Sequence, residues 1–135
     1  MENNLLRVRH YEGKDLPMIR EWWAGHGEGE FPAWLLPPLG VVVECDGAPV
    51  AALWLYMAVK IGVCFAEFPV SRPGLSMAEG REAFRCAVGA LEAAALANDY
   101  RVMICHTLPA IARVMRNFGF RAETRQKITV VKLLA

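Results

Sequence analysis

Glu67 and His106 are the side chains whose sequence surroundings best suit proton transfer. Glu67 lies in an apolar run with Phe65, Phe68 and Val70. Apolar surroundings raise the pKa of a carboxyl group and make it a candidate general base. The alternative interpretation of Glu67 is a rim carboxylate exposed on an alternating strand. His106 ends a later apolar run, and a lone histidine there also fits a purely structural role.

A second set of residues suits the binding of phosphate. The stretch after Val70 forms a glycine-containing turn that leads into a long alanine-rich helix, and the first backbone amides of a helix bind anions. Ala78 lacks the conformational freedom with which glycine allows a close approach. The alternative is an ordinary solvated turn with a helix cap. The candidate contacts are Ser71, Arg72, Ser76, Met77, Ala78, Gly80 and Arg81.

Aromatic residues gather around the loop that follows the first predicted helix, and this loop has the composition of a lid. Glu21, Glu28 and Glu30 accompany them, so an aromatic pocket with an acidic rim could receive a cationic amine. Alternatively, the rings pack the lid onto the sheet and the acidic side chains are solvated. The aromatic residues are Trp22, Trp23, Phe31 and Trp34.

Hydrophobic periodicity predicts the elements that position these residues. Alternating or β-branched runs predict strands at 6–10, 40–45, 49–58, 62–70, 101–106 and 128–134, of which 101–106 is expected to be buried. Asp46-Gly47 predicts a hairpin turn between two of these strands. Helices are predicted after an Asp15 cap, over 77–98, and from a Thr107 cap to a Gly119 C-terminus.

Length and charge exclude several classes of protein. With 135 residues and 55% hydrophobic content, 1–135 is expected to form a single domain. A balance of 15 Lys and Arg against 14 Asp and Glu predicts neither nucleic-acid nor membrane binding. The 4 cysteines lack the close spacing of metal sites or disulfide frameworks, so we expect reduced core residues. Without a signal sequence or a long apolar run, a soluble cytoplasmic protein is expected.

The order of these elements resembles the GNAT acyltransferase superfamily over essentially the whole chain. One matching segment is 67–80, where the family has a Val followed by a Gln/Arg-x-x-Gly-x-Gly/Ala turn. Gly80 matches the last glycine of that turn, whereas Ala78 replaces the earlier glycine and Leu75 replaces the Gln or Arg. The other segment, 109–120, is similar to the family's final helix and its terminal Gly-Phe. The chain looks most like small phage-borne or bacterial members.

The resemblance implies an α+β (α/β) fold with a mixed, mostly antiparallel sheet of six to seven strands and three to four flanking helices. It implies acetyl-CoA as cosubstrate and no metal, with the pantetheine arm along the fourth strand. The acyl group would pass to a small-molecule or peptide amine by direct attack in a ternary complex. Cofactor contacts carry over to Phe68, Val70, Ser71, Arg72, Ser76, Met77, Ala78, Gly80, Arg81, Thr107 and Asn117.

The chain departs from the family at the proton donor. The tyrosine usual in the last helix aligns with Met115, and a thioether donates no proton. Glu67 then stands as the catalytic base, directly or through water. His106 or Thr107 would replace the tyrosine as the acid.

Two other functions fit the same sequence. The departures from the family pattern also fit a catalytically inactive domain that binds CoA or a protein partner. A third interpretation is a homodimerisation module, with Trp54, Tyr56 and the predicted 128–134 strand facing a second copy.

Overall fold

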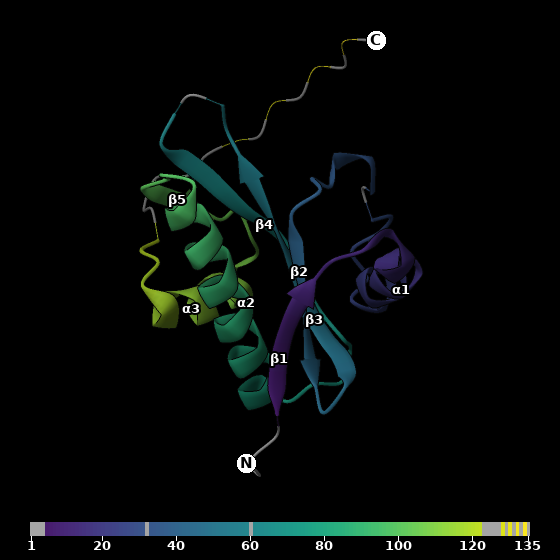
Figure 1. Cartoon of the computed structure of the whole chain (residues 1–135). Coiled ribbons are helices and arrows are strands. Elements are labelled where there is room, and N and C mark those ends of the chain that lie inside the picture. The colour runs from purple at the N-terminus through teal and green to yellow at the C-terminus, as the bar shows by residue number, and fades with distance from the viewer. Residues whose placement is uncertain are drawn as a thin grey trace.

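The protein has one central sheet with helices on both faces (Figure 1). The computed structural model describes residues 5–31, 33–59 and 61–122, together with 128, 130, 132 and 134. Helices α2 and α3 lie on one face of the sheet and α1 lies on the other (Figure 1). The elements are β1 Leu6–His10, α1 Leu16–Gly25, β2 Gly40–Cys45, β3 Ala48–Met57, β4 Val63–Ser71, α2 Met77–Ala97, β5 Val102–Ile104 and α3 Pro109–Met115, with 3-10 turns at Gly13–Asp15, Ala33–Leu35 and Arg116–Phe118.

The sheet follows the order of the chain, β1-β2-β3-β4-β5. The first four strands are antiparallel, and β5 alone pairs parallel, along β4. A parallel neighbour needs a long crossover, and the 21-residue helix α2 provides it. The predicted hairpin turn is confirmed, because Asp46 and Gly47 both have positive φ. The fold class predicted from the sequence is confirmed.

Strand alternation divides the interior into two cores. In β2, Val41 and Val43 face the core under α2, whereas Val42 faces the core under α1. The α1 core holds Trp54, which is fully buried and packs edge-on against Tyr11. Because both faces are covered, β3 is buried over most of its length.

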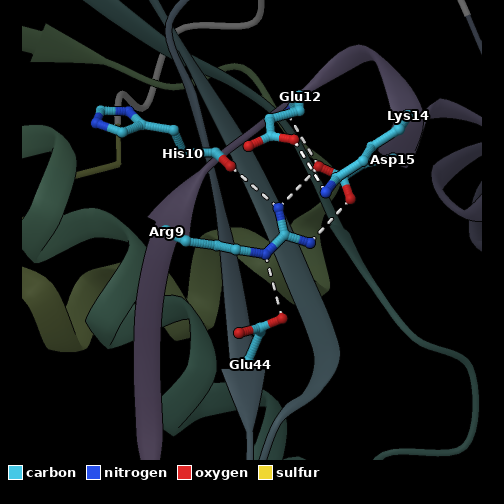
Figure 2. A network of polar contacts seen from close by, with 6 residues as sticks. All are labelled: Arg9, His10, Glu12, Lys14, Asp15 and Glu44. Atoms are coloured by element: carbon cyan, nitrogen blue, oxygen red, sulfur yellow. Dashed lines mark hydrogen bonds and ion pairs between the residues drawn. The ribbon is translucent and has the colours of Figure 1, made fainter.

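Polar contacts tie β1 to the start of α1 (Figure 2). The Arg9 guanidinium pairs with both carboxylate oxygens of Asp15, at 2.8 and 2.9 Å, and donates to Glu44 at 3.1 Å. Asp15 is 6% exposed. Its hydrogen bond from Arg9 holds the pKa of the carboxyl below its usual range. The His10 imidazole points away from this network (Figure 2).

Several details of the predicted elements are wrong. Asp15 stands at the N-cap position of α1 but makes no side-chain cap, because Arg9 and the Glu12 amide occupy its carboxylate. Thr107 does not cap α3, because Leu108 holds the N-cap position. The strand predicted at 101–106 is not buried, since β5 is a short edge strand with Val102 51% exposed. The helix over 77–98 is confirmed. Helix α3 ends at Met115, earlier than predicted, and Gly119, in the left-handed conformation, caps the 3-10 turn Arg116–Phe118 that follows it.

The described residues form 5 strands, fewer than the six to seven predicted. The strand predicted at 128–134 is not among these five, and its residues 129, 131 and 133 lie outside the described residues. All four cysteines are free, in agreement with the expectation of reduced thiols. No helix in the described part of the chain is long and apolar enough to cross a membrane.

Candidate functional site at the opening between β4 and β5

Strand β4 extends well beyond the end of its parallel neighbour. The last paired residues are Phe65 and Ile104, after which β5 ends. Across β3, Ala52 pairs with Val70 and Trp54 pairs with Glu67, so β4 holds one extra residue between these two pairs. Such a bulge bends a strand and leaves its ladder locally open. Because β5 ends after the pair of Phe65 with Ile104, the edge of β4 that faces β5 has no strand partner from 66 to 71 among the described residues.

Phe68 adopts the strained conformation in the bulge. Its φ of 55° lies in the left-handed region, which costs a non-glycine residue about 1–2 kcal/mol. Its ring lies about 6 Å from those of Trp23, Phe31 and Tyr56. Aromatic packing therefore holds the bulge in place. The Phe68 side chain packs in the α1 core, so only the backbone of Phe68 is available at the free edge of β4.

Glu67 and His106 meet across this opening. Each lies two residues beyond the last paired position of its strand, so the two side chains share one face of the sheet. The backbone amide of His106 donates to Glu67 Oε1 at 3.1 Å. Nδ1 of the His106 ring lies 2.7 Å from the same oxygen. The Glu67 carboxylate thus replaces the backbone carbonyl that would accept the next hydrogen bond between the two strands.

The two members of this pair differ in exposure. The Glu67 side chain is 17% exposed, whereas the His106 side chain is 70% exposed. Burial raises the pKa of the Glu67 carboxyl, and the hydrogen bonds from His106 oppose that rise. Phe65 stacks on the imidazole at 6.0 Å between ring centroids, with 16° between the planes. Glu67 is therefore the anchored member and His106 the accessible one.

A cavity of about 960 Å³ lies beside His106, and Glu67 is not among its lining residues. Its wall includes His106 and Thr107, strand β5, the C-terminal half of α2, one side of α3, and residues 118–122. Met115, the residue at the expected tyrosine position, also lines it and is 2% exposed. Asn117 is exposed in the 3-10 turn after α3 and is not among the lining residues.

Cys105, next to His106, is not a nucleophile. Burial, with a smaller contribution from the Glu67 charge, raises the pKa of its thiol to about 12. The thiolate is the reactive form of cysteine. Cys105 therefore stays protonated at neutral pH, which disfavours a covalent acyl intermediate on this residue.

The start of α2 is closed by its own side chains. Ser76 Oγ accepts from the Glu79 amide at 3.1 Å, and the Glu79 carboxylate accepts from the Ser76 amide at 3.0 Å. The Gly80 amide donates to the Ser76 carbonyl. Of the amides predicted to hold phosphate, those of Met77 and Ala78 therefore remain without a partner in the described part of the chain. The pattern Ser-x-x-Glu is a capping box, and it could have been read from the sequence.

The other predicted cofactor residues lie at the end of β4, in the loop that follows it and near the start of α2. Val70 is buried in the α1 core. The Ser71 carbonyl accepts from His26 Nε2 at 2.8 Å, and the Arg72 amide donates to the Val50 carbonyl. Arg81 is exposed on the first turn of α2. The structure thus brings Glu67 and His106 together but does not gather the phosphate candidates around one point.

The aromatic residues near α1 mainly pack against the sheet. Trp22 and Phe31 are each 6% exposed within the α1 core. Trp23 packs beside Phe31 and donates its indole N–H to the Glu28 carbonyl at 3.0 Å. Trp34 is 81% exposed. Three of the four aromatic residues therefore pack against the sheet, as in the alternative interpretation, rather than lining an open pocket. Full burial of Trp54 also removes it from any surface that could face a second copy.

Comparisons with known proteins agree with this architecture. No protein-family model and no curated protein matches the sequence. Among solved structures, aminoglycoside N-acetyltransferase AAC(6')-Iy in complex with a CoA-S-monomethyl-acetylneamine bisubstrate analog aligns with a TM-score of 0.68. The two chains are 17% identical, and the alignment covers 96% of this chain and 99% of the other. The chain has the GNAT acetyltransferase fold.

Two further structures with this GNAT fold come from other organisms. An acetyltransferase from Trypanosoma brucei aligns with a TM-score of 0.64 and 19% identity, covering 94% of this chain and all of the other. A putative acetyltransferase from Agrobacterium tumefaciens aligns with a TM-score of 0.65 and 18% identity, covering 93% and 99%. At these identities the likeness concerns the fold.

Proposed function

We propose that the protein is an acetyl-CoA-dependent N-acyltransferase that transfers an acyl group to an amine by direct attack in a ternary complex. The observation that carries this proposal is the Glu67–His106 pair at the free edge of β4, within a GNAT acetyltransferase fold. A pair of titratable groups beside a cavity is what proton transfer requires. Cys105 offers no competing covalent route.

The described residues fit the arm of the cosubstrate better than its diphosphate. The unpaired edge of β4 from 66 to 71 can hydrogen-bond an extended chain in the manner of an added strand. At α2, the amides of Met77 and Ala78 are the candidate phosphate donors, with Arg72 and Arg81 nearby in sequence. The Glu79 carboxylate lies beside them and repels an anion until it turns away. We therefore expect acetyl-CoA to bind, with a modest contribution to its affinity from the N-terminus of α2.

The acceptor in this proposal is a small-molecule or peptide amine. One of the matching structures is an aminoglycoside acetyltransferase in complex with sisomicin, and another holds the bisubstrate analog described above. The cavity beside His106 has room for such a molecule. In the described part of the chain, no group of His, Cys, Asp and Glu side chains could hold a metal ion. We further propose a cytoplasmic location, since free cysteines are typical of reducing compartments.

Thermal denaturation tests cosubstrate binding. Acetyl-CoA and CoA should each raise the melting temperature, because a ligand that binds only the folded state stabilises it. A comparison of CoA with CoA that lacks its 3′-phosphate measures how much this phosphate contributes to binding. No shift at millimolar acetyl-CoA would contradict the proposal. Where binding is found, release of the CoA thiol is then followed with a panel of amines.

A second function, a CoA-binding or protein-binding domain without catalysis, is favoured by one specific observation. Met115 is a buried thioether at the position of the expected proton donor. The two functions differ in the same experiment. A catalytically inactive domain shows the thermal shift with acetyl-CoA but releases no thiol with any amine.

A further inference from the structure

We propose that His106 is the catalytic acid and base of the transfer, and that Glu67 is a positioning residue that acts through it. This inference rests on the proposed acyltransferase function and deepens it. It changes the role of Glu67 from base to orienting group. It also makes a separate tyrosine unnecessary.

Hydrogen bonding at Glu67 Oε1 decides which nitrogen carries the ring proton. The backbone amide of His106 can only donate, so Oε1 acts as an acceptor there. Acceptance of this N–H favours the ionised carboxylate, which has no proton to give to the ring. The contact of 2.7 Å from the same oxygen to Nδ1 is then satisfied by an Nδ1–H donor. In the neutral ring, Nε2 consequently keeps its lone pair.

Exposure and packing assign the reacting group. The Glu67 carboxylate is largely buried and already engaged by His106, whereas the imidazole is largely exposed, and His106 is one of the residues that line the cavity. Stacking of Phe65 on the ring limits its rotation. A carboxylate that fixes the tautomer and plane of a histidine is an established way to prepare a proton-transfer group. The same arrangement here leaves Nε2 as the atom that can meet a substrate.

The proposed transfer balances with one imidazole. The acceptor reacts as a neutral amine, and its nitrogen forms a bond to the thioester carbonyl carbon while Nε2 takes one proton from that nitrogen. The carbon–sulfur bond then breaks, its electron pair goes to sulfur, and Nε2 returns the proton to that sulfur. The products are an amide and a thiol. The imidazole ends in its starting form, so the thioether of Met115 is no obstacle.

Kinetics of three variants test the assignment. His106→Gln should lower kcat for thiol release at least about 100-fold, the usual size of general acid–base catalysis. KM and the thermal shift with acetyl-CoA should remain within about twofold, since Gln leaves the β4 edge intact. Glu67→Gln should also lower kcat, by no more than His106→Gln does, because the ring remains but loses the tautomer and orientation that the carboxylate fixes. His10→Gln is the matched control, since His10 is exposed and points away from the Arg9 network (Figure 2).

Nitrogen NMR of the imidazole in the free protein gives a readout that needs no turnover. The wild type should show His106 protonated at Nδ1 and unprotonated at Nε2, and Glu67→Gln should show a mixture of the two tautomers. Added imidazole should restore part of the activity of His106→Ala, as expected for a lost proton carrier.

Several outcomes would overturn the inference. A His106→Gln variant with kcat near that of the wild type would leave the acyltransferase function standing and remove His106 from the chemistry. A larger loss in Glu67→Gln than in His106→Gln would make Glu67 the base itself. An Nε2–H tautomer in the wild type would contradict the geometry. A wild type that binds acetyl-CoA but acetylates no amine would instead overturn the proposed function, and this inference with it.

Discussion

Two carboxylates at different places in the sheet have opposite electrostatic environments. Asp15, beside β1, forms a bidentate ion pair with the Arg9 guanidinium, and the pKa of its carboxyl lies below the usual range. Glu67, on β4, is paired with an imidazole, and burial raises its pKa. Both are largely buried. The two pKa values differ in direction because the always charged Arg9 guanidinium outweighs burial at Asp15, whereas burial outweighs the hydrogen bonds from His106 at Glu67.

The surroundings of the two carboxylates differ in the same sense. Around Asp15, strand β1 is paired over five residues and the neighbouring core is closed by large aromatic rings. Around Glu67, β5 pairs over only three residues and a cavity adjoins the open edge. Stable pairing and dense packing at one end of the sheet thus support an open, titratable site at the other end. Four predictions test this contrast, in order of expected size.

The largest expected effect comes from Gly40, beneath Trp54. A Cβ at Gly40 would lie 2.4 Å from Cδ1 of the fully buried Trp54 ring. Gly40→Ala should therefore lower the free energy of unfolding by about 3 kcal/mol, as overpacking of a dense core does. Urea denaturation measures this change. A loss below about 0.5 kcal/mol would show that this end of the sheet is loosely packed.

Asp15→Asn should lower the free energy of unfolding by about 2 kcal/mol. Removing one partner of a fully buried pair costs more, but the Arg9 side chain is 30% exposed and keeps Glu44. The matched control is Glu82→Gln, which breaks an exposed pair with Arg85 and should cost far less than Asp15→Asn.

The Asp15 effect should also depend on pH in a defined direction. A carboxyl whose folded-state pKa is lowered stabilises the protein above its unfolded pKa of 3.8, and that contribution is lost as pH falls through the folded value. The stabilities of wild type and Asp15→Asn should accordingly converge on acidification below pH 3.8. A gap that stays constant with pH would contradict the assignment of the Arg9–Asp15 pair.

Gly89→Ala should have the opposite sign to Gly40→Ala. Gly89 lies in the middle of α2, and a Cβ there meets nothing within 4 Å. Replacing glycine with alanine in a helix interior should raise the free energy of unfolding by about 0.5–1 kcal/mol. Thermal denaturation of the two variants side by side makes the comparison. A destabilised Gly89→Ala would place a neighbour against α2 that the described residues do not include.

The smallest expected effect is that of Glu67→Gln on stability. A raised folded-state pKa gives stability that is present below the ordinary value of 4.5 and is lost as pH rises through the raised value. Glutamine does not titrate, so Glu67→Gln should gain stability relative to the wild type as pH rises, by less than about 1 kcal/mol. Urea denaturation at several pH values checks this trend. A relative loss would mean that His106 outweighs burial.

Local pattern in the sequence was sufficient for the element order but not for the site. The amphipathic spacing of Phe84, Val88 and Leu91 predicts α2, and all three belong to its buried face. By contrast, the 101–106 run does not reveal that only 102–104 pair, because strand length depends on the neighbouring strand. The Glu67–His106 contact depends on the register of two strands separated by α2. Nothing local in the sequence encodes that register.

Titration of the side-chain carboxyl carbons by NMR in the ligand-free protein tests the central contrast most directly, because one experiment follows both groups. Asp15 should titrate below 3.8 and Glu67 above 4.5, each with the direction set by its partner and its burial. In His106→Gln the Glu67 midpoint should rise further, since the imidazole contacts that favour its charged form are gone. A Glu67 midpoint at or below 4.5 in the wild type would contradict the account.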